Sequence, residues 1–414
     1  MEDTLNERFP VGIEVGEAVQ MLLSAVHVMD TEEVRIGDSY GRVLAADIPA
    51  DTDIPPFDRS PLDGYAVRAE DTLDASAEQP VVLKVIDNVP AGHVPAVPVR
   101  TGEASRIMTG APVPEGADAV VKYEDTVFTD TEVRISSPVR SDSNVVHAGE
   151  DVRAGQIVLS AGKAITPADA GILAGLGVAR PLVYRQPKVM IISTGDELLD
   201  VSEPLSSGKI RNSSAYMLAG FLKEWGIRAD VYGIVQDDTG AISKAVCDCF
   251  ECADCVITTG GASVGDCDLT RSAMESAGAR ILFWKVRMKP GMMTAAAVRN
   301  GRLMLGLSGS PSAAAAALFL LGLPAFRKMC GRRDLYCPRI KVTLPDGFPK
   351  KSPVGRVLPG KLVFRDALPL IDIYPQQSNG MMSHWCGCNL IGMVPAGSDR
   401  IPPETVIDAY YLGV

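Results

Sequence analysis

Apolar and polar positions along the chain change their spacing several times, and each change predicts a different kind of element. Residues 11–30 carry apolar side chains at helical spacing, so we expect a helix there. Short runs of alternating polarity, separated by Pro and Gly, fill 51–149 and are typical of a small β-rich domain. The segment TPADAGILAGLG within 150–186 predicts a helix capped by Thr166. The β-rich domain is therefore expected as an insertion into a longer element.

The spacing becomes β-α-β at about residue 187. KVMIIST, RADVYGIV, CVITTGG and RLMLGLSGS are candidate buried strands, and each is followed by a helical segment. Such alternation predicts a doubly wound, mostly parallel sheet covered on both faces. The last segment has the pattern of a β-domain. We therefore expect an α/β and β multidomain chain with four parts: 1–50 together with 150–186 as a discontinuous helical linker domain, 51–149, 187–328, and a barrel-like 335–414.

Composition narrows the class of protein. The chain has 414 residues, of which 46% are hydrophobic and 22% charged, as expected of a globular protein with more than one domain. A net charge of −11 argues against bulk binding to nucleic acid or to an anionic membrane. The start, MEDTLNERFP, is polar, so we expect no signal peptide. The apolar stretch 313–326 is interrupted by Gly322 and Pro324, and we expect a cytoplasmic protein that does not span a membrane.

Nine cysteines raise the question of a metal site. Four of them crowd into CDCFECADC at 247–255. The segment ISKAVCDCFECAD also predicts an amphipathic helix with Ile242, Val246 and Cys249 on one face, followed by a strand from Cys255. Ligands divided between a helix and a strand would not converge easily, so we favour structural cysteines. Metal binding stays open as the alternative, and we expect no disulfides in a reducing cytoplasm.

The stretch ADCVITTGGASVGDCD at 253–268 combines paired glycines with two carboxylates. Gly260 and Gly261 at the end of a strand let the backbone turn tightly and approach a ligand. Asp266 and Asp268 follow, and carboxylate oxygens suit a hard divalent cation. A strand-to-helix turn with a helix cap is the plainer alternative. The other three strand candidates end in similar turns (STGDEL, VQDDTG and GLSGSPSAAAA), and ligands bind at that edge of an open α/β sheet.

Candidate anion-binding groups follow the glycine turns. In GLSGSPSAAAA, Gly309, Ser310, Pro311 and Ser312 stand at the start of a helix, whose unpaired N–H groups and dipole attract anions. In FWKVRMKPG, an extended backbone would place Lys285, Arg287 and Lys289 on one face. Capping and solvated surface charge are the respective alternatives.

Further acids are expected at the same sheet edge, namely Glu197 in STGDEL and Asp237 in VQDDTG. Together with the basic row they fit a Mg²⁺-assisted reaction of a phosphorylated ligand. The sequence has no Walker A motif and no convincing Ser-His or Cys-His pairing. A separate loop, PPFDRSPLDGYAVRAEDT, presents Asp63 in an Asp-Gly turn that by itself does not demand catalysis.

Taken together, PPFDRSPLDGYAV, RIMTGAPVPEGADAVVKYED, ISTGDEL, TTGGASVGDCD, FWKVRMKPG and GLSGSPSAA resemble, in this order, the motifs of the MoeA family. These molybdopterin molybdotransferases are related to the C-terminal domain of gephyrin. The resemblance implies an elongated four-domain subunit, a MogA-like pterin-binding α/β domain, and a homodimer whose partner subunit closes the cleft with its insertion domain. It also implies a reaction in which adenylylated molybdopterin and molybdate react with Mg²⁺, AMP is released, and metal stays on the dithiolene.

The resemblance assigns roles to individual residues. Asp63 and Thr109 resemble residues that the partner subunit contributes to the cleft, and Lys285 and Lys289 resemble a pair that contacts phosphate or molybdate. Glu197, Asp237 and Asp268 resemble the acids that bind or position metal and nucleotide, and Asp266 joins them as a metal candidate from the residue pattern. The turn residues expected to contact the cofactor are Thr194, Gly195, Gly260, Gly261, Ser263, Gly309, Ser310, Pro311 and Ser312.

Some positions depart from the family pattern. Met292 stands where another lysine is usual, and Ser308 and Ser310 replace proline and asparagine in the PGNP turn. Leu62 replaces the methionine of MDGYA, and the C-terminal part matches loosely. Losing a positive charge could change the oxyanion that is preferred, so insertion of tungstate instead of molybdate stays an alternative.

Two other functions compete. An enzyme that adenylylates molybdopterin, the preceding step, would lack the LDGYA-bearing insertion; such an adenylyltransferase is instead a possible transient partner. A non-catalytic scaffold dimer, as gephyrin's clustering role suggests, is opposed by the retained acids and lysines.

Overall fold

The computed structural model describes residues 8–261, 269–374, 378 and 380–413. The chain forms two compact units. Unit 1 comprises Met1–Ala45, Gly162–Thr166 and Leu182–Val414, and unit 2 comprises Ala46–Ala161 and Pro167–Pro181. Each unit is described by itself, and the four-part division expected from the sequence stays a prediction.

A seven-stranded sheet forms the centre of unit 1. Its order is β1 (Val11–Ile13), β17 (Arg280–Val286), β19 (Ala295–Arg299), β20 (Arg302–Leu307), β16 (Cys255–Thr259), β12 (Lys188–Thr194) and β15 (Arg228–Val235). Every neighbouring pair is parallel except the two that β19 makes. The carboxyl ends of all the other strands therefore lie at one edge of the sheet. The mostly parallel α/β domain expected from the sequence is confirmed.

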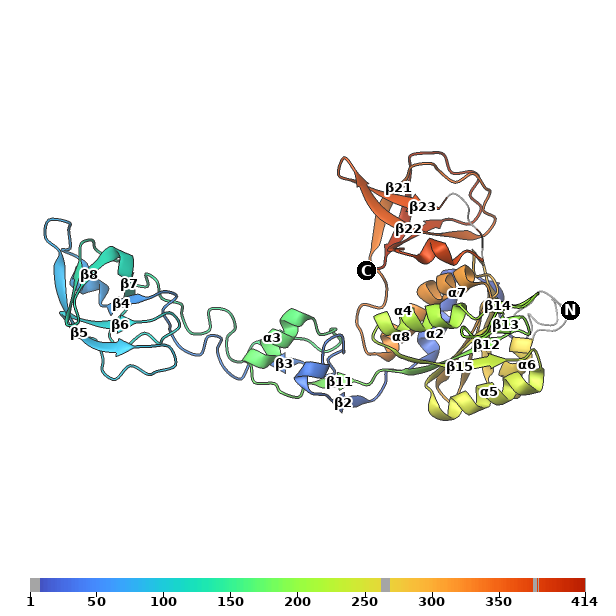
Figure 1. Ribbon diagram of the computed structural model, residues 1–414, viewed down its shortest axis with the longest axis horizontal. Helices are drawn as coiled ribbons and strands as arrows, with labels where there is room; N and C mark the ends of the chain where they lie inside the picture. Colours follow the sequence, from blue (N-terminus) through green and yellow to red (C-terminus); the bar gives the residue numbers. More distant parts are fainter. Residues whose placement is uncertain (1–7, 262–268, 375–377, 379, 414) are drawn as a thin grey trace. The chain divides into compact units, whose positions relative to one another are not determined.

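Helices cover both faces of this sheet, which explains why its strands are apolar on both sides. One face packs on α2 (Val15–Ala25), α4 (Ser214–Glu224) and the helix that contains α7 and α8, while the other packs on α5 (Thr239–Cys252) and α6 (Leu269–Ser276) (Figure 1). Neighbouring residues of β12 alternate accordingly: Ile191 belongs to the first core and Ile192 to the second. The amphipathic helix expected around Cys249 is α5, and Ile242, Val246 and Cys249 are buried in the second core.

One interpretation of the sequence was wrong. Gly322 and Pro324 do not interrupt the apolar stretch, because α7 (Pro311–Ala317), the π-helix η4 (Leu318–Gly322) and α8 (Leu323–Met329) form one helix of 19 residues. The wider π turn precedes Pro324, whose missing N–H would otherwise leave a gap in the helical hydrogen bonds. By length and composition alone this helix could cross a membrane, but 89% of its apolar window is buried inside the protein.

The C-terminal part of unit 1 is a β-domain, as expected. Its sheet order is β18 (Met288–Lys289), β22 (Gly355–Arg365), β23 (Leu368–Ile373), β21 (Arg339–Leu344), β25 (Thr405–Tyr411) and β24 (Leu390–Val394), and β22 also pairs with β24. That second pairing gives the sheet a barrel-like form. The short helix η5 (Met382–Trp385) joins this domain to α7, because the Trp385 indole donates a 3.0 Å hydrogen bond to the Ser312 hydroxyl.

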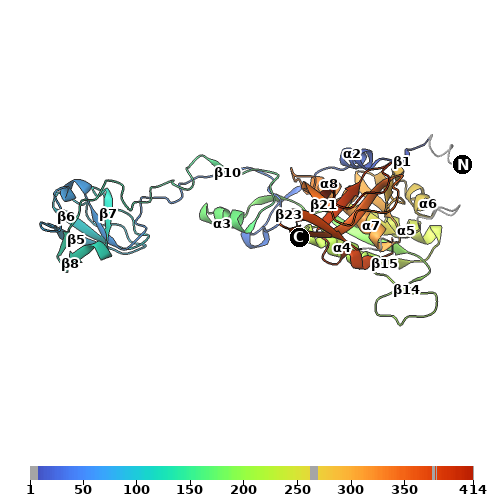
Figure 2. The same ribbon diagram turned by 90° about the horizontal axis from the view of Figure 1, so that it is seen from above.

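Shorter elements complete unit 1. They are β2 (Thr31–Glu33), η1 (Ile36–Asp38), β11 (Leu182–Tyr184), β13 (Leu198–Leu199) and β14 (Ile210–Arg211). β2 pairs with β11, and β13 pairs with β14. Residues 200–209, between β13 and β14, are exposed and form an open loop (Figure 2).

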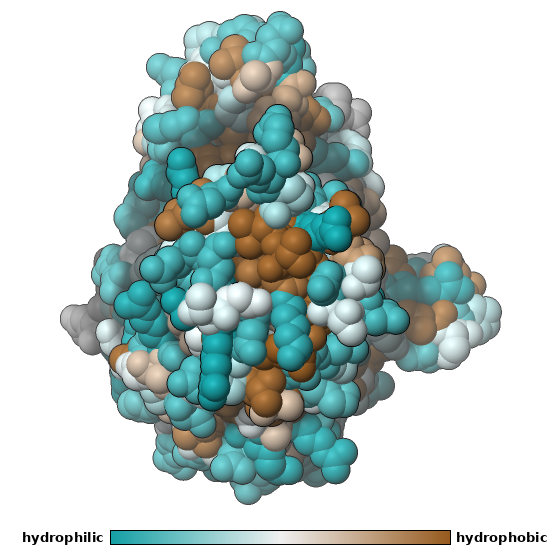
Figure 3. Space-filling view, turned by 90° about the vertical axis from the view of Figure 1, so that its left-hand side faces the viewer, coloured by the Kyte–Doolittle hydropathy of each residue, from teal (hydrophilic) through white to brown (hydrophobic). Residues whose placement is uncertain are grey.

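Unit 2 contains a six-stranded sheet with its own core. The order is β7 (Ala119–Lys122), β4 (Gly64–Val67), β6 (Glu103–Ile107), β5 (Val81–Val89), β9 (Glu132–Ile135) and β8 (Thr126–Phe128). The remaining elements are β3 (Ile48–Pro49), η2 (Ala69–Thr72), η3 (Tyr123–Asp125), β10 (Ile157–Leu159) and the expected helix α3 (Pro167–Gly175). Tyr65 is buried at the centre of the core, whereas Leu73 and Val127 are exposed apolar side chains. Figure 3 looks onto the side of the molecule that lies at the left in Figure 1, and it shows apolar side chains, in brown, gathered among polar ones.

Candidate functional site

A cavity of about 970 Å³ lies where the strands of the unit 1 sheet end. It is lined by Glu197, Ile210, Arg211, Ser213, Asp237, Gly260, Gly261, Leu269, Ser308, Gly309, Ser310, Pro311, Gly380 and Met382. Four loops that follow β12, β15, β16 and β20 contribute to this lining. Because parallel strands bring their carboxyl ends together, residues far apart in the sequence meet here.

Glycines allow the strand ends to pack this closely. Gly260 has a φ of +96°, and a Cβ placed on it would lie 2.1 Å from the carbonyl oxygen of Thr194. A Cβ on Gly309 would lie 3.3 Å from the Cα of Gly260. The ends of β12, β16 and the loop after β20 are therefore in near backbone contact, which a larger residue at 260 would prevent. Their N–H groups and hydroxyls can then face a ligand together.

Hydroxyl groups line the same strand ends. Thr259 donates to Ser193 at 3.2 Å, and Ser193 donates to the side-chain oxygen of Asn212 at 3.1 Å, so this buried chain is satisfied internally. The hydroxyl of Thr194 differs. It is buried and has no hydrogen-bond partner within the described part of the chain. A buried hydroxyl without a partner is costly, and a ligand atom at this edge could satisfy it.

The residues at the helix start, 309–312, have two different roles. Ser310 is the N-cap position, and its N–H donates to the Ser308 hydroxyl at 3.2 Å while the residue itself lines the cavity. Ser312 is 2% exposed, and its hydroxyl accepts the hydrogen bond from Trp385. The side chain of Ser312 therefore serves the packing of the C-terminal domain. Gly309, Ser310 and Pro311 are the residues of this turn that line the cavity.

Carboxylates crowd at one side of the cavity. Burial raises the pKa of Asp237, and the charges of Asp196 and Glu197 raise it further, against a hydrogen bond with Asp196 that lowers it. The Glu197 carboxylate folds back over Gly195, so that a Cβ on Gly195 would lie 2.5 Å from one of its oxygens. Glu197 and Asp237 are the two of these acids that line the cavity, and a cation between them would offset the unfavourable charge around Asp237.

The predicted lysines lie at different places. Lys285 is half-buried near the end of β17, at the sheet edge where the other parallel strands end. Its φ of +65° is left-handed, so the backbone from Lys285 to Lys289 is not one extended strand as expected. Burial nevertheless alternates, with Val286 and Met288 buried and Arg287 and Lys289 exposed. Arg287 forms a 2.7 Å ion pair with Glu14, and neither Lys285 nor Lys289 lines the cavity described above.

Three predicted residues, Ser263, Asp266 and Asp268, lie outside the described residues, and their assignment rests on the sequence alone. Within the described residues there is no cluster of three or more His, Cys, Asp or Glu side chains that could hold a metal ion. Of the predicted acids, Glu197 and Asp237 are the two that the structure places in the cavity.

Asp63 and Thr109 form a pair in unit 2. Asp63 accepts hydrogen bonds from the Thr109 N–H at 2.7 Å and from the Thr109 hydroxyl at 2.8 Å. These two bonds hold the pKa of Asp63 below its usual value. The neighbouring Gly64 is required by close packing, because a Cβ there would lie 2.1 Å from the Val121 carbonyl oxygen. Asp63 is therefore an exposed, ionised carboxylate fixed in direction.

Some lining residues were not found from the sequence. Arg211 follows an exposed loop and reaches the cavity through the β13–β14 pairing, while Gly380 and Met382 come from the C-terminal domain. A cation soon after STGDEL was the one available signal for Arg211. No motif marks the other two residues, because their position depends on how η5 packs against α7.

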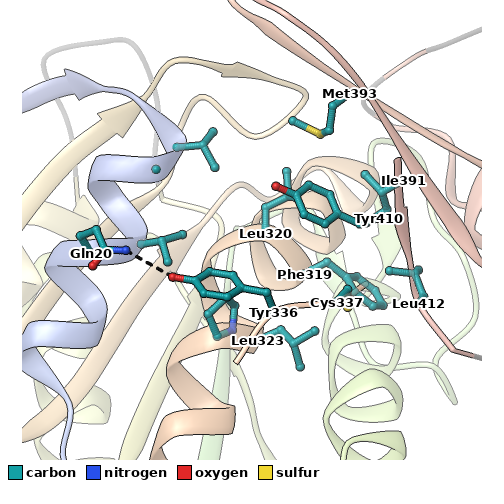
Figure 4. A pocket seen from close by; sticks show the side chains of 14 residues that line it. Gln20, Phe319, Leu320, Leu323, Tyr336, Cys337, Ile391, Met393, Tyr410 and Leu412 are labelled. Atoms are coloured by element: carbon teal, nitrogen blue, oxygen red, sulfur yellow. Dashed lines mark hydrogen bonds between the residues drawn. The ribbon is translucent and has the colours of Figure 1, made fainter. Parts of the chain in front are cut away.

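A second cavity, of about 230 Å³, differs in chemistry (Figure 4). It lies among α2, η4, α8 and the C-terminal strands, and the Gln20 amide donates to the Tyr336 hydroxyl at 3.2 Å across it. Apolar and aromatic side chains such as Phe319 and Tyr410 form most of its wall, and the described residues that line it include no Asp, Glu, Lys, Arg or His. The cavity at the strand ends is therefore the better candidate for chemistry on a charged substrate.

Comparisons with known proteins agree with this geometry. Residues 13–177 match the model of the MoeA N-terminal region (domain I and II), and residues 190–328 match that of a probable molybdopterin binding domain. A molybdopterin molybdenumtransferase of Staphylococcus aureus (strain MRSA252) is 38% identical over 396 residues, covering 96% of this chain and 94% of that protein. The chain belongs to the MoeA family.

Other relatives extend the match to structure. A Staphylococcus epidermidis protein with the same name is 35% identical over 405 residues, covering 98% of this chain and 96% of that protein. The crystal structure of a molybdopterin biosynthesis MoeA protein from Pyrococcus horikoshii has a TM-score of 0.83 at 28% identity and covers 97% of this chain and all of that one. As a MoeA protein, the chain is a transferase of molybdenum cofactor biosynthesis.

Proposed function

We propose that the protein transfers molybdenum onto molybdopterin: it takes adenylylated molybdopterin and molybdate, releases AMP in a Mg²⁺-dependent reaction, and leaves the metal on the dithiolene. The observation that carries this proposal is the composition of one cavity. It joins the glycine-lined strand ends and the start of the Pro311 helix, which suit a phosphorylated ligand, to the crowded acids Glu197 and Asp237.

The donor set fits Mg²⁺. This ion takes oxygen ligands in octahedral geometry and is usually bound by one or two carboxylates together with substrate phosphates and water. Glu197 and Asp237 supply two such carboxylates, and a nearby cation would offset both the desolvation and the negative neighbours that raise the pKa of Asp237. Asp266 and Asp268 are further candidates from the sequence. When bound, Mg²⁺ would neutralise the charge that builds up on the phosphates as AMP leaves.

The other residues bind and orient the substrate. N–H groups around Gly260, Gly261 and Ser310 would hold phosphate oxygens, with the Thr194 hydroxyl as an additional donor. Arg211 would pair with an anionic group from the open side of the cavity. Lys285 and Lys289 would contact molybdate or phosphate, a role that rests on their resemblance to the family pair.

Asp63 and Thr109 are proposed to act in a homodimer. Asp63 is exposed and ionised, and its two hydrogen bonds to Thr109 fix its direction. The folding of unit 2 does not require this exposed charge. We expect it to complete the cavity of the partner subunit. Two inactive variants, Asp63→Asn and Asp237→Asn, mixed so that subunits exchange, should regain activity, since a mixed dimer keeps one intact site. No recovery in subunits shown to exchange would contradict a shared site.

The proposed reaction is tested by AMP release from adenylylated molybdopterin with Mg²⁺ and with molybdate, tungstate or neither. Release stimulated by molybdate supports the proposal, and stimulation by tungstate alone would favour the tungstate alternative, for which the departure at Met292 leaves room. The Asp237→Asn variant is the matched control, because it removes one charge at nearly constant shape. No release with either oxyanion would favour a cofactor-binding or scaffold dimer.

The cellular setting is part of the proposal. We expect a cytoplasmic protein that receives its substrate from a molybdopterin adenylyltransferase, through solution or a transient contact. Free cysteines are consistent with a reducing compartment: burial raises the pKa of Cys249 to about 12, which keeps this thiol protonated and unreactive.

A further inference from the structure

A second polar cavity, of about 390 Å³, lies at the opposite end of the same strands. Lys188 is the first residue of β12, Arg228 the first of β15 and Arg302 the first of β20, and all three line it. Because these strands are parallel, their amino ends meet at the edge opposite the candidate active site. The two cavities are therefore on opposite edges of one sheet.

The register of the sheet places these cations in a row. Lys188 is directly paired with Arg228, and the pairings of Cys255 with Val189 and Leu303 set Asp254 level with Lys188 and Arg302. Neighbouring strands are about 4.8 Å apart. Two like charges side by side on adjacent strands repel each other, and an anion placed against the Lys188–Arg228 pair would relieve this repulsion.

The nearby acids are already engaged. Asp254 accepts hydrogen bonds from both terminal nitrogens of Arg185, at 2.8 and 2.9 Å, and from the Lys188 N–H at 2.8 Å. Glu32 forms an ion pair with Arg42. Within the described residues, Lys188 and Arg228 have no hydrogen-bonded or ion-paired acid, the charge of Arg302 acts on Asp254, and Glu251 is the one other acid in the wall. The wall holds four cations and three acids, a small positive surplus in a protein of net charge −11.

We propose that this cavity binds a compact oxyanion, either phosphate or pyrophosphate, at a site separate from the candidate active site. Lys188 and Arg228 lie side by side without an acidic partner, and Arg302 lies in the same wall beyond Asp254, an arrangement that matches an anion with several charged oxygens. The residues that the structure describes in this wall include no aromatic side chain on which a nucleotide base could stack. The small volume and the polar wall therefore favour the inorganic ion over a nucleotide.

Cys252 provides a built-in reporter, because this exposed thiol lines the cavity. The purified protein is treated with iodoacetamide, a neutral reagent, and alkylation of each cysteine is followed by peptide mass spectrometry. Pyrophosphate at ten times its Kd should slow alkylation of Cys252 about tenfold, by simple occupancy. Cys386, also exposed but in the C-terminal domain, is the internal control and should not change. Low ionic strength is used, because salt screens exposed charges.

Charge-removing variants test whether the cations of this cavity cause the protection. Lys188→Gln combined with Arg228→Gln should abolish the protection, since these changes remove charge but leave the Arg185–Asp254 pair intact. Lys244→Gln, which removes an exposed cation of α5 outside the cavity, is the matched control and should keep the protection. Lys289→Gln, which changes a residue of the proposed active site, should also keep the protection. The result for this cavity is therefore independent of whether the proposed function is correct.

Three outcomes would overturn the proposal. One is an unchanged rate at Cys252 with both phosphate and pyrophosphate at about 10 mM, a concentration at which even a weak site of millimolar Kd is filled. Another is equal slowing at Cys386, which would indicate a general ionic effect. The third is protection by a phosphoserine peptide but not by pyrophosphate, which would make this cavity a protein-docking site instead.

Discussion

Asp63 and Asp237 are both predicted to take part in the reaction, but the protein treats their charges in opposite ways. Asp63 in unit 2 receives two hydrogen bonds from Thr109, which lower its pKa. Asp237 in unit 1 is an exposed residue whose carboxyl is partly desolvated, and this desolvation, together with the charges of Asp196 and Glu197, raises its pKa. The charge of Asp63 is stabilised by its hydrogen bonds to Thr109, whereas the charge of Asp237 is only partly compensated, by one hydrogen bond with Asp196. This difference separates a positioning role from a cation-binding role.

Neutralising Asp237 should have the largest effect. Asp237→Asn removes one of the carboxylates proposed for Mg²⁺, and metal contributions of several kcal/mol correspond to a loss of about a thousandfold in AMP release. The folded state should not be weakened, because the substitution removes repulsion. Steady-state kinetics over a range of Mg²⁺ concentrations and a thermal melt without Mg²⁺ check both parts. A variant with normal Mg²⁺ dependence would show that Asp237 does not bind the cation.

Neutralising Asp63 should produce a different signature. Asp63→Asn should lower kcat about a hundredfold, the usual scale for a positioned acid or base, while the Mg²⁺ concentration for half-maximal rate stays the same. Thr109→Val keeps the N–H bond to Asp63 and loses the hydroxyl bond, so its effect should be smaller. If Asp63→Asn instead shifted the Mg²⁺ dependence, the separation of roles between the two carboxylates would be wrong.

Displacing the Glu197 carboxylate should have a moderate effect. In Gly195→Ala, the new methyl group would lie 2.5 Å from a Glu197 oxygen, so the carboxylate must move while its charge is kept. We expect Mg²⁺ to bind roughly tenfold more weakly, the lower end of the range for changes that disturb metal ligands. Gly233→Ala in β15 is the matched control, because Gly233 also has a positive φ, of +134°, and nothing lies within 4 Å of its Cβ, so it reproduces the backbone strain alone. Equal Mg²⁺ affinity in both variants would exclude Glu197 as a ligand.

Much of this arrangement could be predicted from the sequence, for a physical reason. Strands such as KVMIIST and CVITTGG are apolar on both faces and end in glycine turns, so a parallel sheet with its ligand edge at Gly195 and Gly260 follows from pattern alone. The motifs around Glu197, Asp237 and Ser310 then mark the same edge, and the structure places all three in one cavity.

What the sequence could not supply depends on tertiary packing. Arg211 and Met382 reach the cavity through a strand pairing and a domain contact that no local pattern encodes. Ser312 has the same residue type as Ser310 and lies two positions away, yet it is buried against Trp385. The continuous helix across Pro324 was missed because a π turn, which propensity does not predict, accommodates the proline.

Lowering the pH should change the stability contributions of Asp237 and Asp63 in opposite directions, and this is the smallest of the expected effects. The raised pKa of Asp237 means that the folded state binds its proton more readily than the unfolded state, so this group adds stability as pH falls through the raised pKa, fully so below the ordinary value of 3.8. The lowered pKa of Asp63 has the opposite effect on stability: its contribution is present above 3.8 and is lost as pH falls through the lowered value.

Melting temperatures of wild type and Asp237→Asn without Mg²⁺ should therefore differ at neutral pH, with wild type lower, and converge as pH falls. For Asp63→Asn the variant should be the less stable protein at neutral pH, and the difference should disappear only at lower pH. The same direction of change in both pairs would contradict the opposite settings of the two charges.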